Sequence, residues 1–302
     1  MQEIKQLVER CREYTPLGRV ASYIPELSHA DPSRLAVSVL SSGGSLNEGD
    51  FTESFTMQSI VKPMILLLAL SDRGEEAVRS LVGEEATGKP FDAFNYSDRA
   101  LAPENINPMV NAGAIALCTL IDGRDYTHRL ERLLDLVRRM SGDPTLEVDM
   151  SVYRSEKETG NKNRALAYML KAYGMIHDDV EQLLDVYFSA CSIRVTTAHL
   201  ASIAYILASG GVNTRGERLI TRRQAKYVNA IMMTSGMYDG SGEFAVKVGI
   251  PAKSGVGGGI MAVVPGKMGI GIYSPALDAK GNSVAGCKLL ELMSEKYDLC
   301  IF

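Results

Sequence analysis

The sequence has few of the residues on which several common kinds of site depend. Its four histidines never stand at the spacing of metal ligands, which argues against metal catalysis and against a serine–histidine–aspartate triad. Its five cysteines form an odd set without a C-x-x-C pair, so neither a disulfide framework nor a zinc site is indicated, and reduced core thiols are expected. We therefore expect no metal and no other cofactor.

Long runs of one residue class are also missing. The 32 basic and 36 acidic residues give a formal net charge of −4 without a long run of either sign, so the positive field that a nucleic acid requires is absent. The longest apolar stretch, which ends at Leu70, is far shorter than the roughly 20 residues that span a bilayer. The charged, amphipathic N-terminus does not have the pattern of a secretory signal. These features predict a cytoplasmic protein with neither a nucleic-acid nor a membrane partner.

The first part of the chain shows helical and then strand-like patterns. Its 302 residues suffice for one large core or two closely packed domains. Apolar residues at helical spacing predict an amphipathic helix over residues 2–14. The β-branched run at 35–40, the glycine-rich segment at 41–50 and the run at 51–56 predict a β-hairpin whose turn is the middle segment.

The rest of the chain divides into a helical and a strand-rich part. Helical patterns fill residues 59 to about 208, and most of them end near a glycine or a charged turn, as helices commonly do. A helical block of this length between strands suggests a lobe of its own. Short apolar segments broken by glycine, beginning with residues 243–249, predict antiparallel strands, and a last helix is predicted at 283–299. Strands from the first and last parts of the chain are expected to share one sheet.

One short pattern indicates chemistry. In QSIVKP, Ser59 and Lys62 are three residues apart, so on a helix they lie on the same face about one turn from each other. A serine is a poor nucleophile unless a base takes its proton, and a lysine can do so when burial lowers its pKa toward neutrality. The apolar run after Lys62 predicts that burial. Ser59 and Lys62 are therefore the candidate nucleophile and base.

A second pattern, late in the chain, supports the first. Lys253, Ser254 and Gly255 form a K-[ST]-G triplet, which accompanies S-x-x-K in class A β-lactamases and penicillin-binding proteins. The glycines that follow would let the backbone approach a substrate carbonyl closely. The N–H groups of Val256 and Ser59 are then candidates for an oxyanion hole, in which each donor stabilises the transition state by roughly 3 to 4 kcal/mol.

Longer segments of the chain resemble a known family. Seven segments between about residue 18 and residue 286 resemble the signature segments of the serine-dependent glutaminases and occur in the same order. They are RVASYIPELS, MQSIVKP, NPMVNAGAI, YRSEKETGNKN, DVYFSACSI, TSGMYDGSGEFAVKVGIPAKSGVGGGI and VVPGKMGIGIYSPALDAKGNSVAG. The resemblance implies that L-glutamine is hydrolysed to L-glutamate and ammonia through a γ-glutamyl ester of Ser59. It also implies self-association, as a homotetramer or a homodimer.

The resemblance implies a fold as well. This is the α/β (α+β) fold of β-lactamases and DD-peptidases, an antiparallel sheet flanked by helices plus a helical lobe. Residues 1–60 and 195–302 would form a discontinuous sheet domain, and residues 61–194 a mainly helical domain. The active site would lie at their junction.

Further site residues follow from the resemblance. Tyr187 and Tyr238 match tyrosines that line the pocket, one of which would relay a proton to the departing ammonia, and the sequence leaves open which one. Glu156 matches the acid that would hold the substrate's α-ammonium group. The other matches, which would contact the substrate together with Ser59, Tyr187, Tyr238 and Val256, are Tyr23, Gln58, Asn111 and Asn163.

Two alternative functions stay open at this point. One is a β-lactam-recognising serine hydrolase, which shares the S-x-x-K and K-[ST]-G patterns, although an export signal and an S-D-N motif are missing. The other is a non-catalytic glutamine-binding protein, although the sequence retains Ser59, Lys62, Tyr187 and Tyr238.

Overall fold

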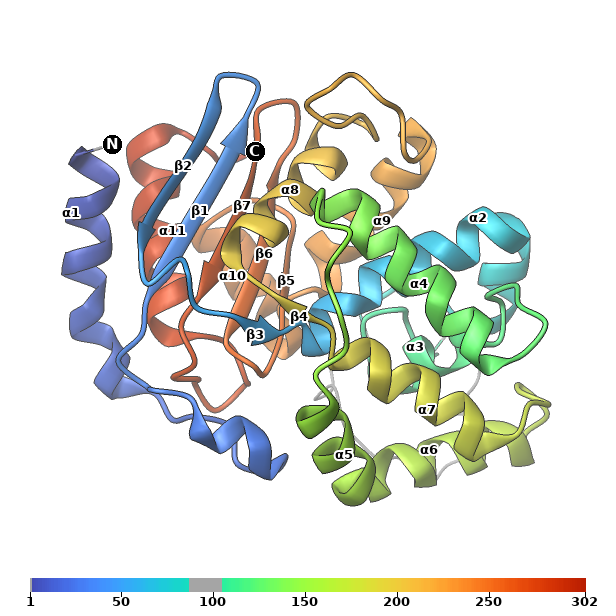
Figure 1. Cartoon of the computed structure of the whole chain (residues 1–302). Coiled ribbons are helices and arrows are strands. Elements are labelled where there is room, and N and C mark those ends of the chain that lie inside the picture. The colour runs from blue at the N-terminus through green and yellow to red at the C-terminus, as the bar shows by residue number, and fades with distance from the viewer. Residues whose placement is uncertain (1, 87–104) are drawn as a thin grey trace.

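The computed structural model describes residues 2–86 and 105–302 and shows a mixed α/β chain built on one antiparallel sheet (Figure 1). The sheet has five strands in the order β2-β1-β7-β6-β5. They are β1 (Ala36–Ser41), β2 (Gly44–Gly49), β5 (Ala252–Ser254), β6 (Gly259–Val264) and β7 (Met268–Tyr273). Strands from the first and last parts of the chain therefore share one sheet, and both this prediction and the predicted fold class are confirmed.

Helices cover both faces of the sheet. Along β6, Ile260 and Ala262 belong to one hydrophobic core and Met261 and Val263 to another, because successive side chains of a strand point to opposite faces. The first core contains α1 (Gln2–Cys11), α10 (Ser241–Lys247) and α11 (Val284–Tyr297). On the other face lies α8 (Thr197–Ala208).

Glycines allow α8 to lie directly on the backbone of β7. A methyl group at Gly271 would come within 2.0 Å of the carbonyl oxygen of Thr197. At Gly269 it would come within 2.2 Å of the carbonyl oxygen of Ala201. Any larger residue at these two positions would force the helix away from the sheet.

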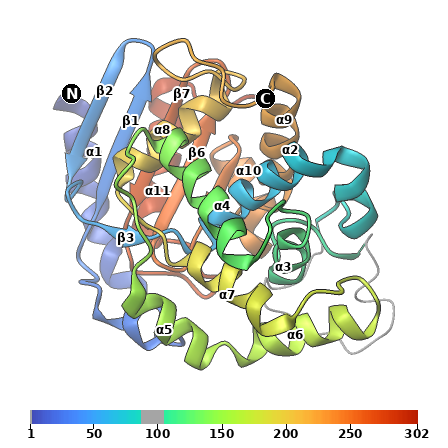
Figure 2. The same cartoon turned by 45° about the vertical axis from the view of Figure 1, so that its right-hand side comes forward.

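The remaining helices gather beside the sheet, as Figure 2 shows. They are α2 (Lys62–Leu81), α3 (Asn111–Cys118), α4 (Tyr126–Ser141), α5 (Met150–Thr159), α6 (Asn161–Ala172), α7 (Val180–Cys191) and α9 (Arg222–Ser235). The short 3₁₀ helices are η1 (Arg12–Leu17), η2 (Pro25–His29), η3 (Gln58–Val61) and η5 (Tyr238–Gly240). None of the helices in the described ranges is both long and apolar enough to cross a membrane.

A two-stranded ladder lies where the helical segment leaves and rejoins the sheet region. It pairs β3 (Phe55–Thr56) with β4 (Arg194–Val195), and the amide of Met57 continues it by donating to the carbonyl of Ile193 at 2.9 Å. Immediately after this ladder come η3 and the start of α2. The candidate nucleophile therefore lies at the boundary between the sheet and the helices.

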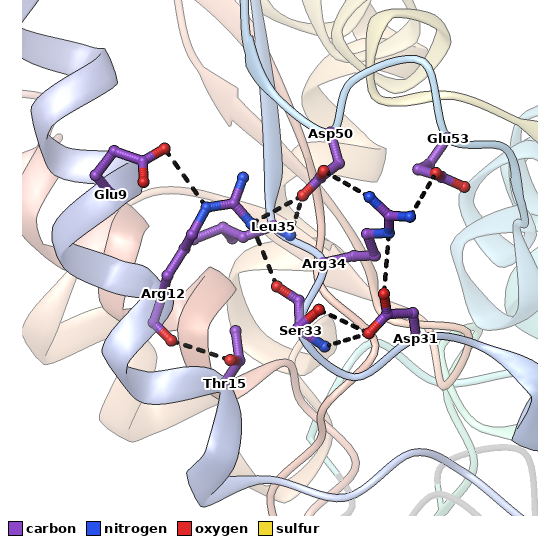
Figure 3. A network of polar contacts seen from close by, with 9 residues as sticks. All are labelled: Glu9, Arg12, Thr15, Asp31, Ser33, Arg34, Leu35, Asp50 and Glu53. Atoms are coloured by element: carbon purple, nitrogen blue, oxygen red, sulfur yellow. Dashed lines mark hydrogen bonds and ion pairs between the residues drawn. The ribbon is translucent and has the colours of Figure 1, made fainter.

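A polar network joins the N-terminal helices to the start of the sheet (Figure 3). Asp50 accepts hydrogen bonds from the guanidinium groups of Arg12 at 2.9 Å and Arg34 at 3.0 Å. It also accepts one from the amide of Leu35 at 3.0 Å. Although burial raises the pKa of Asp50, these hydrogen bonds hold it below its ordinary value, so the carboxylate stays charged and ties η1 to β1.

The predicted hairpin is partly wrong. Residues 44–49, expected within the turn, form β2 itself, and the turn contains only Ser42 and Gly43. Residues 51–56 leave the sheet, and their last two residues form β3. The apolar pattern missed β2 because it is a largely exposed edge strand whose pairing follows from the tight turn rather than from a buried face.

The strand predicted at residues 243–249 is also wrong, because this segment lies mostly in helix α10. Phe244 and Val248 are 7% and 2% exposed, whereas Val246 between them is 89% exposed. In a strand all three side chains would face the same side, while in a helix residues four apart share a face. The helices at 2–14 and 283–299 are confirmed, although the first ends at Cys11 and continues as η1, and α9 lies outside the predicted helical block.

Candidate active site

Ser59 and Lys62 lie on consecutive turns at the sheet–helix boundary. Ser59 is in η3, and Lys62 is the first residue of α2, followed by a proline that suits the first turn of a helix. Ser59 is 6% exposed and Lys62 is fully buried under the apolar residues of α2. The predicted burial of Lys62 is therefore confirmed.

The amine of Lys62 is held by the segment that begins α3. It donates to Oδ1 of Asn111 at 2.6 Å and to the carbonyl of Met109 at 3.2 Å. Burial lowers the pKa of Lys62 from 10.5 to about 8, against the opposing influence of Cys191 and Glu156. A lysine with such a pKa can release its proton near neutral pH, as a base for a serine must.

Asn111 joins three of the candidate residues. Its Oδ1 also accepts a hydrogen bond from the hydroxyl of Tyr187 at 3.3 Å, and its Nδ2 donates to Oδ1 of Asn163 at 2.9 Å. Residues from α2, α3, α6 and α7 thus meet at one side chain. The sequence motifs identified these residues separately, whereas the structure shows that they form one hydrogen-bonded group.

Glu156 is a buried carboxylate on the inner side of α5. It is 5% exposed, and its Oε2 has no hydrogen-bond partner among the described residues. Burial raises its pKa from 4.5 to about 8, although a hydrogen bond from Gln58 and the charge of Lys62 favour the ionised form. A buried carboxylate oxygen without a partner is suited to a cationic ligand group.

Gln58 lies between Glu156 and the β3 strand. Its Nε2 donates to Oγ1 of Thr56 at 3.3 Å. Gln58 also has a φ of 48°, which is uncommon for a residue with a side chain and turns the chain sharply before Ser59.

Tyr238 approaches Ser59 from the sheet side. It opens η5 with a φ of 55°, a conformation that costs about 1–3 kcal/mol for residues other than glycine. Burial raises the pKa of Tyr238 above its ordinary value, and the nearby Ser59 hydroxyl opposes that rise, so the two hydroxyls lie close together. Strained residues of this kind occur often at functional sites.

The turn that carries Val256 packs against the segment before Ser59. A methyl group at Gly255 would lie 2.6 Å from the carbonyl oxygen of Met57, so the two backbones are in close contact. In the described part of the chain, the amide of Val256 donates to no backbone carbonyl, whereas Gly255 and Gly258 both do. The Val256 N–H therefore has the freedom that an oxyanion donor needs.

Tyr23 is the most accessible of the predicted site residues, with 56% of its surface exposed. The next residue, Ile24, packs in a small apolar cluster with Val152, Tyr238 and Val256. The segment that carries Tyr23 therefore covers the region between Tyr238 and Val256.

Two participants had no signal in the sequence. The carbonyl of Met109 contributes only backbone, so no residue type could indicate it. Cys191 is a buried core thiol, as expected, and it also lies one turn after Tyr187 in α7, where burial and then Glu156 raise its pKa well above the ordinary value. Of the other cysteines, Cys300 is exposed, contrary to the expectation of core thiols.

Comparison with known proteins identifies the family of the chain. The glutaminase family model matches residues 18–302. A glutaminase of Clostridium tetani is 49% identical over 302 residues, with 99% of each chain covered, and one of Alkaliphilus metalliredigens is 48% identical over 303 residues, with 100% of this chain and 99% of that protein covered. A solved covalent complex of a Bacillus subtilis glutaminase with 5-oxo-L-norleucine has a TM-score of 0.91 and 38% identity, and the match covers 100% of this chain and 99% of that one. The chain therefore belongs to the glutaminase family.

Proposed function

We infer that the protein hydrolyses L-glutamine to L-glutamate and ammonia. Its membership of the glutaminase family along nearly the whole chain supports this activity. The observation that best supports the catalytic mechanism is that Lys62, one turn after Ser59, is fully buried and has a pKa lowered to about 8. Neither a β-lactam hydrolase nor a non-catalytic binding protein is favoured, because the similar proteins are glutaminases.

The reaction begins at the serine. Lys62 takes the proton of Ser59, whose oxygen attacks the side-chain amide carbon of glutamine. The N–H groups of Ser59 and Val256 stabilise the negative oxygen of the tetrahedral intermediate. When the C–N bond breaks, the leaving nitrogen takes a proton and departs as ammonia, and water then hydrolyses the γ-glutamyl ester to regenerate Ser59.

Tyr238 is the better placed of the two tyrosines to relay the proton to the leaving nitrogen. The Ser59 hydroxyl lies near enough to that of Tyr238 to act against the rise of its pKa, whereas the hydroxyl of Tyr187 donates a hydrogen bond to Oδ1 of Asn111 at 3.3 Å. A proton relay must lie within hydrogen-bonding distance of the reacting groups. Tyr187 then has the task of orienting Asn111, which in turn holds the amine of Lys62.

Substrate recognition rests on one acid and several neutral donors. The unpartnered Oε2 of Glu156 accepts from the α-ammonium group, and Asn163 and Tyr187 contact the α-carboxylate. Asn111 contributes to the same wall of the site. Gln58 holds the carboxylate of Glu156 in place, and Tyr23 closes the site from the outside.

We also propose the cytoplasm as the compartment and a homo-oligomer, a homotetramer or a homodimer, as the working form. Five free cysteines fit a reducing compartment. The division into a sheet domain of residues 1–60 and 195–302 and a helical domain of residues 61–194 fits the position of Ser59 at the β3–β4 ladder. Light scattering on the purified protein would give the number of subunits.

The test of the activity is a balance of products. Purified protein should release one ammonia and one glutamate for each L-glutamine consumed, with L-asparagine measured alongside. The diazo ketone 6-diazo-5-oxo-L-norleucine, which forms a covalent complex with the Bacillus subtilis glutaminase, should inactivate the protein and add one group to the peptide that contains Ser59. A lack of ammonia release, or a group added elsewhere, would contradict the proposal.

The rate should depend on pH through Lys62. Below a pKa of about 8, the fraction of unprotonated amine falls about tenfold for each pH unit. We therefore expect kcat/KM for L-glutamine to fall about tenfold between pH 7 and pH 6. Protein returned from pH 6 to pH 8 should regain its activity, which separates titration from unfolding, and a flat profile over this range would refute Lys62 as the base.

A further inference from the structure

Lys253 is a buried lysine that has no part in the proposed reaction. It lies in the middle of β5 and is completely buried, which is rare for a lysine without a partner of opposite charge. Among the described residues, no carboxylate forms an ion pair with its amine, which instead contacts two backbone carbonyls and an aromatic ring. Burial and then the charge of Lys62 lower the pKa of Lys253 well below its ordinary value.

Three groups surround the amine of Lys253. It donates to the carbonyl of Ser254 at 2.6 Å and to the carbonyl of Gly236 at 3.1 Å. It also lies 4.4 Å from the centre of the ring of Tyr238. These three contacts match the three N–H groups of an ammonium, two toward oxygens and one toward the negative face of an aromatic ring.

The contacts of Lys253 converge on the turn that carries Tyr238. A methyl group at Gly236 would lie 1.8 Å from the carbonyl oxygen of Ala252, so this turn lies directly against β5. The carbonyl of Gly236 also accepts from the amide of Ser254 at 3.1 Å. Lys253 therefore fastens the turn to the sheet through both backbone and ring.

The backbone of the turn is held from its other side by Ser241. The hydroxyl of Ser241 accepts from the amide of Met237 at 3.0 Å and donates to the carbonyl of Tyr238 at 2.8 Å. These bonds fix the positive φ of Tyr238 but do not touch its ring. The ring itself packs in the apolar cluster with Ile24, Val152 and Val256, and the amine of Lys253 lies 4.4 Å from its centre.

We propose that Lys253 is a positioning residue that holds the ring of Tyr238 so that its hydroxyl meets Ser59. This inference rests on the proposed role of Tyr238 in the reaction. A lysine is suited to the task because one flexible side chain reaches two carbonyls and the face of the ring. Loss of the amine leaves the strained turn and the apolar packing of the ring in place but removes the charged contact that fixes the orientation of the ring.

A double-mutant cycle tests the proposal, with Lys253→Met, Tyr238→Phe and the double variant. Lys253→Met should lower kcat for L-glutamine by about 10²-fold with little change in KM, because a displacement of about 1 Å near the reacting atoms has an effect of this size. In the Tyr238→Phe background, where no hydroxyl is left to position, the same substitution should change kcat by less than about threefold. Independent, multiplicative losses would overturn the proposal.

Two further measurements make the outcome unambiguous. Lys267→Met is the matched control, because Lys267 is an exposed lysine that donates to the carbonyl of Asp298 at 3.0 Å. The Lys267→Met variant should hydrolyse L-glutamine as fast as the parent protein. If Lys253→Met does not fold, the same double-mutant cycle is measured with Lys253→Gln, which keeps one hydrogen-bonding N–H₂ group. An unchanged kcat in Tyr238→Phe alone would overturn both the role of Tyr238 and that of Lys253. A large loss of kcat in Tyr238→Phe, combined with independent losses in the double variant, would overturn only the role of Lys253.

Discussion

Lys62→Met is expected to lower glutamine hydrolysis by about 10³-fold or more without lowering the stability of the protein. The rate falls because no other base touches Ser59 in the proposed reaction. Methionine has a similar length to lysine and can occupy the same buried space. Ammonia release and thermal unfolding, both measured at pH 8, would check the two parts of this prediction.

The stability of this variant reflects two opposing terms. Because burial lowers the pKa of Lys62 from 10.5 to about 8, holding its charge in the folded protein at pH 7 costs on the order of 3 kcal/mol, which methionine removes. The carbonyl of Met109 and Oδ1 of Asn111 lose a donor, at about 1–3 kcal/mol each, although Tyr187 still donates to Asn111. The two terms nearly cancel.

The pH dependence of stability provides a second measurement on the same variant. A lysine whose folded pKa lies below its unfolded value makes the protein more stable as pH rises from about 8 to 10.5. Lys62→Met should weaken this rise, and Lys267→Met should not. A large fall in the unfolding temperature of Lys62→Met would contradict the expected balance and would attribute the lost activity to unfolding.

Glu156→Gln is expected to lower kcat/KM for L-glutamine by about 10²- to 10³-fold, mostly through KM. Leaving one member of a buried charge pair without its partner costs about 3–5 kcal/mol, and here the unpaired member would be the substrate's α-ammonium group. Glu158→Gln is the matched control, because Glu158 lies on the same helix but is exposed. Initial rates over a range of L-glutamine concentrations would separate KM from kcat.

A substrate without the α-amino group identifies what Glu156 recognises. The parent protein should prefer L-glutamine to glutaramate, the analogue that lacks this group, by a factor similar to the loss in Glu156→Gln. The variant should hydrolyse the two compounds with nearly equal kcat/KM. A variant that still prefers L-glutamine by the full factor would refute Glu156 as the partner of the ammonium.

The sequence by itself determined the features that depend on neighbours along the chain. Apolar spacing predicted the terminal helices and the buried start of α2, because helical periodicity shows in a single segment. The three-residue spacing of Ser59 and Lys62 implied their proximity for the same reason. The K-[ST]-G triplet indicated the importance of residues 253–255 but not the role of Lys253.

Only the tertiary structure decided how distant segments meet. It showed that Asn111 holds Lys62, that Glu156 is buried rather than solvated, and that β2 rather than residues 51–56 pairs with β1. The same applies to Lys253, whose amine reaches a turn that begins 17 residues earlier in the chain. These arrangements depend on burial and hydrogen bonds between elements, which no local pattern of residues encodes.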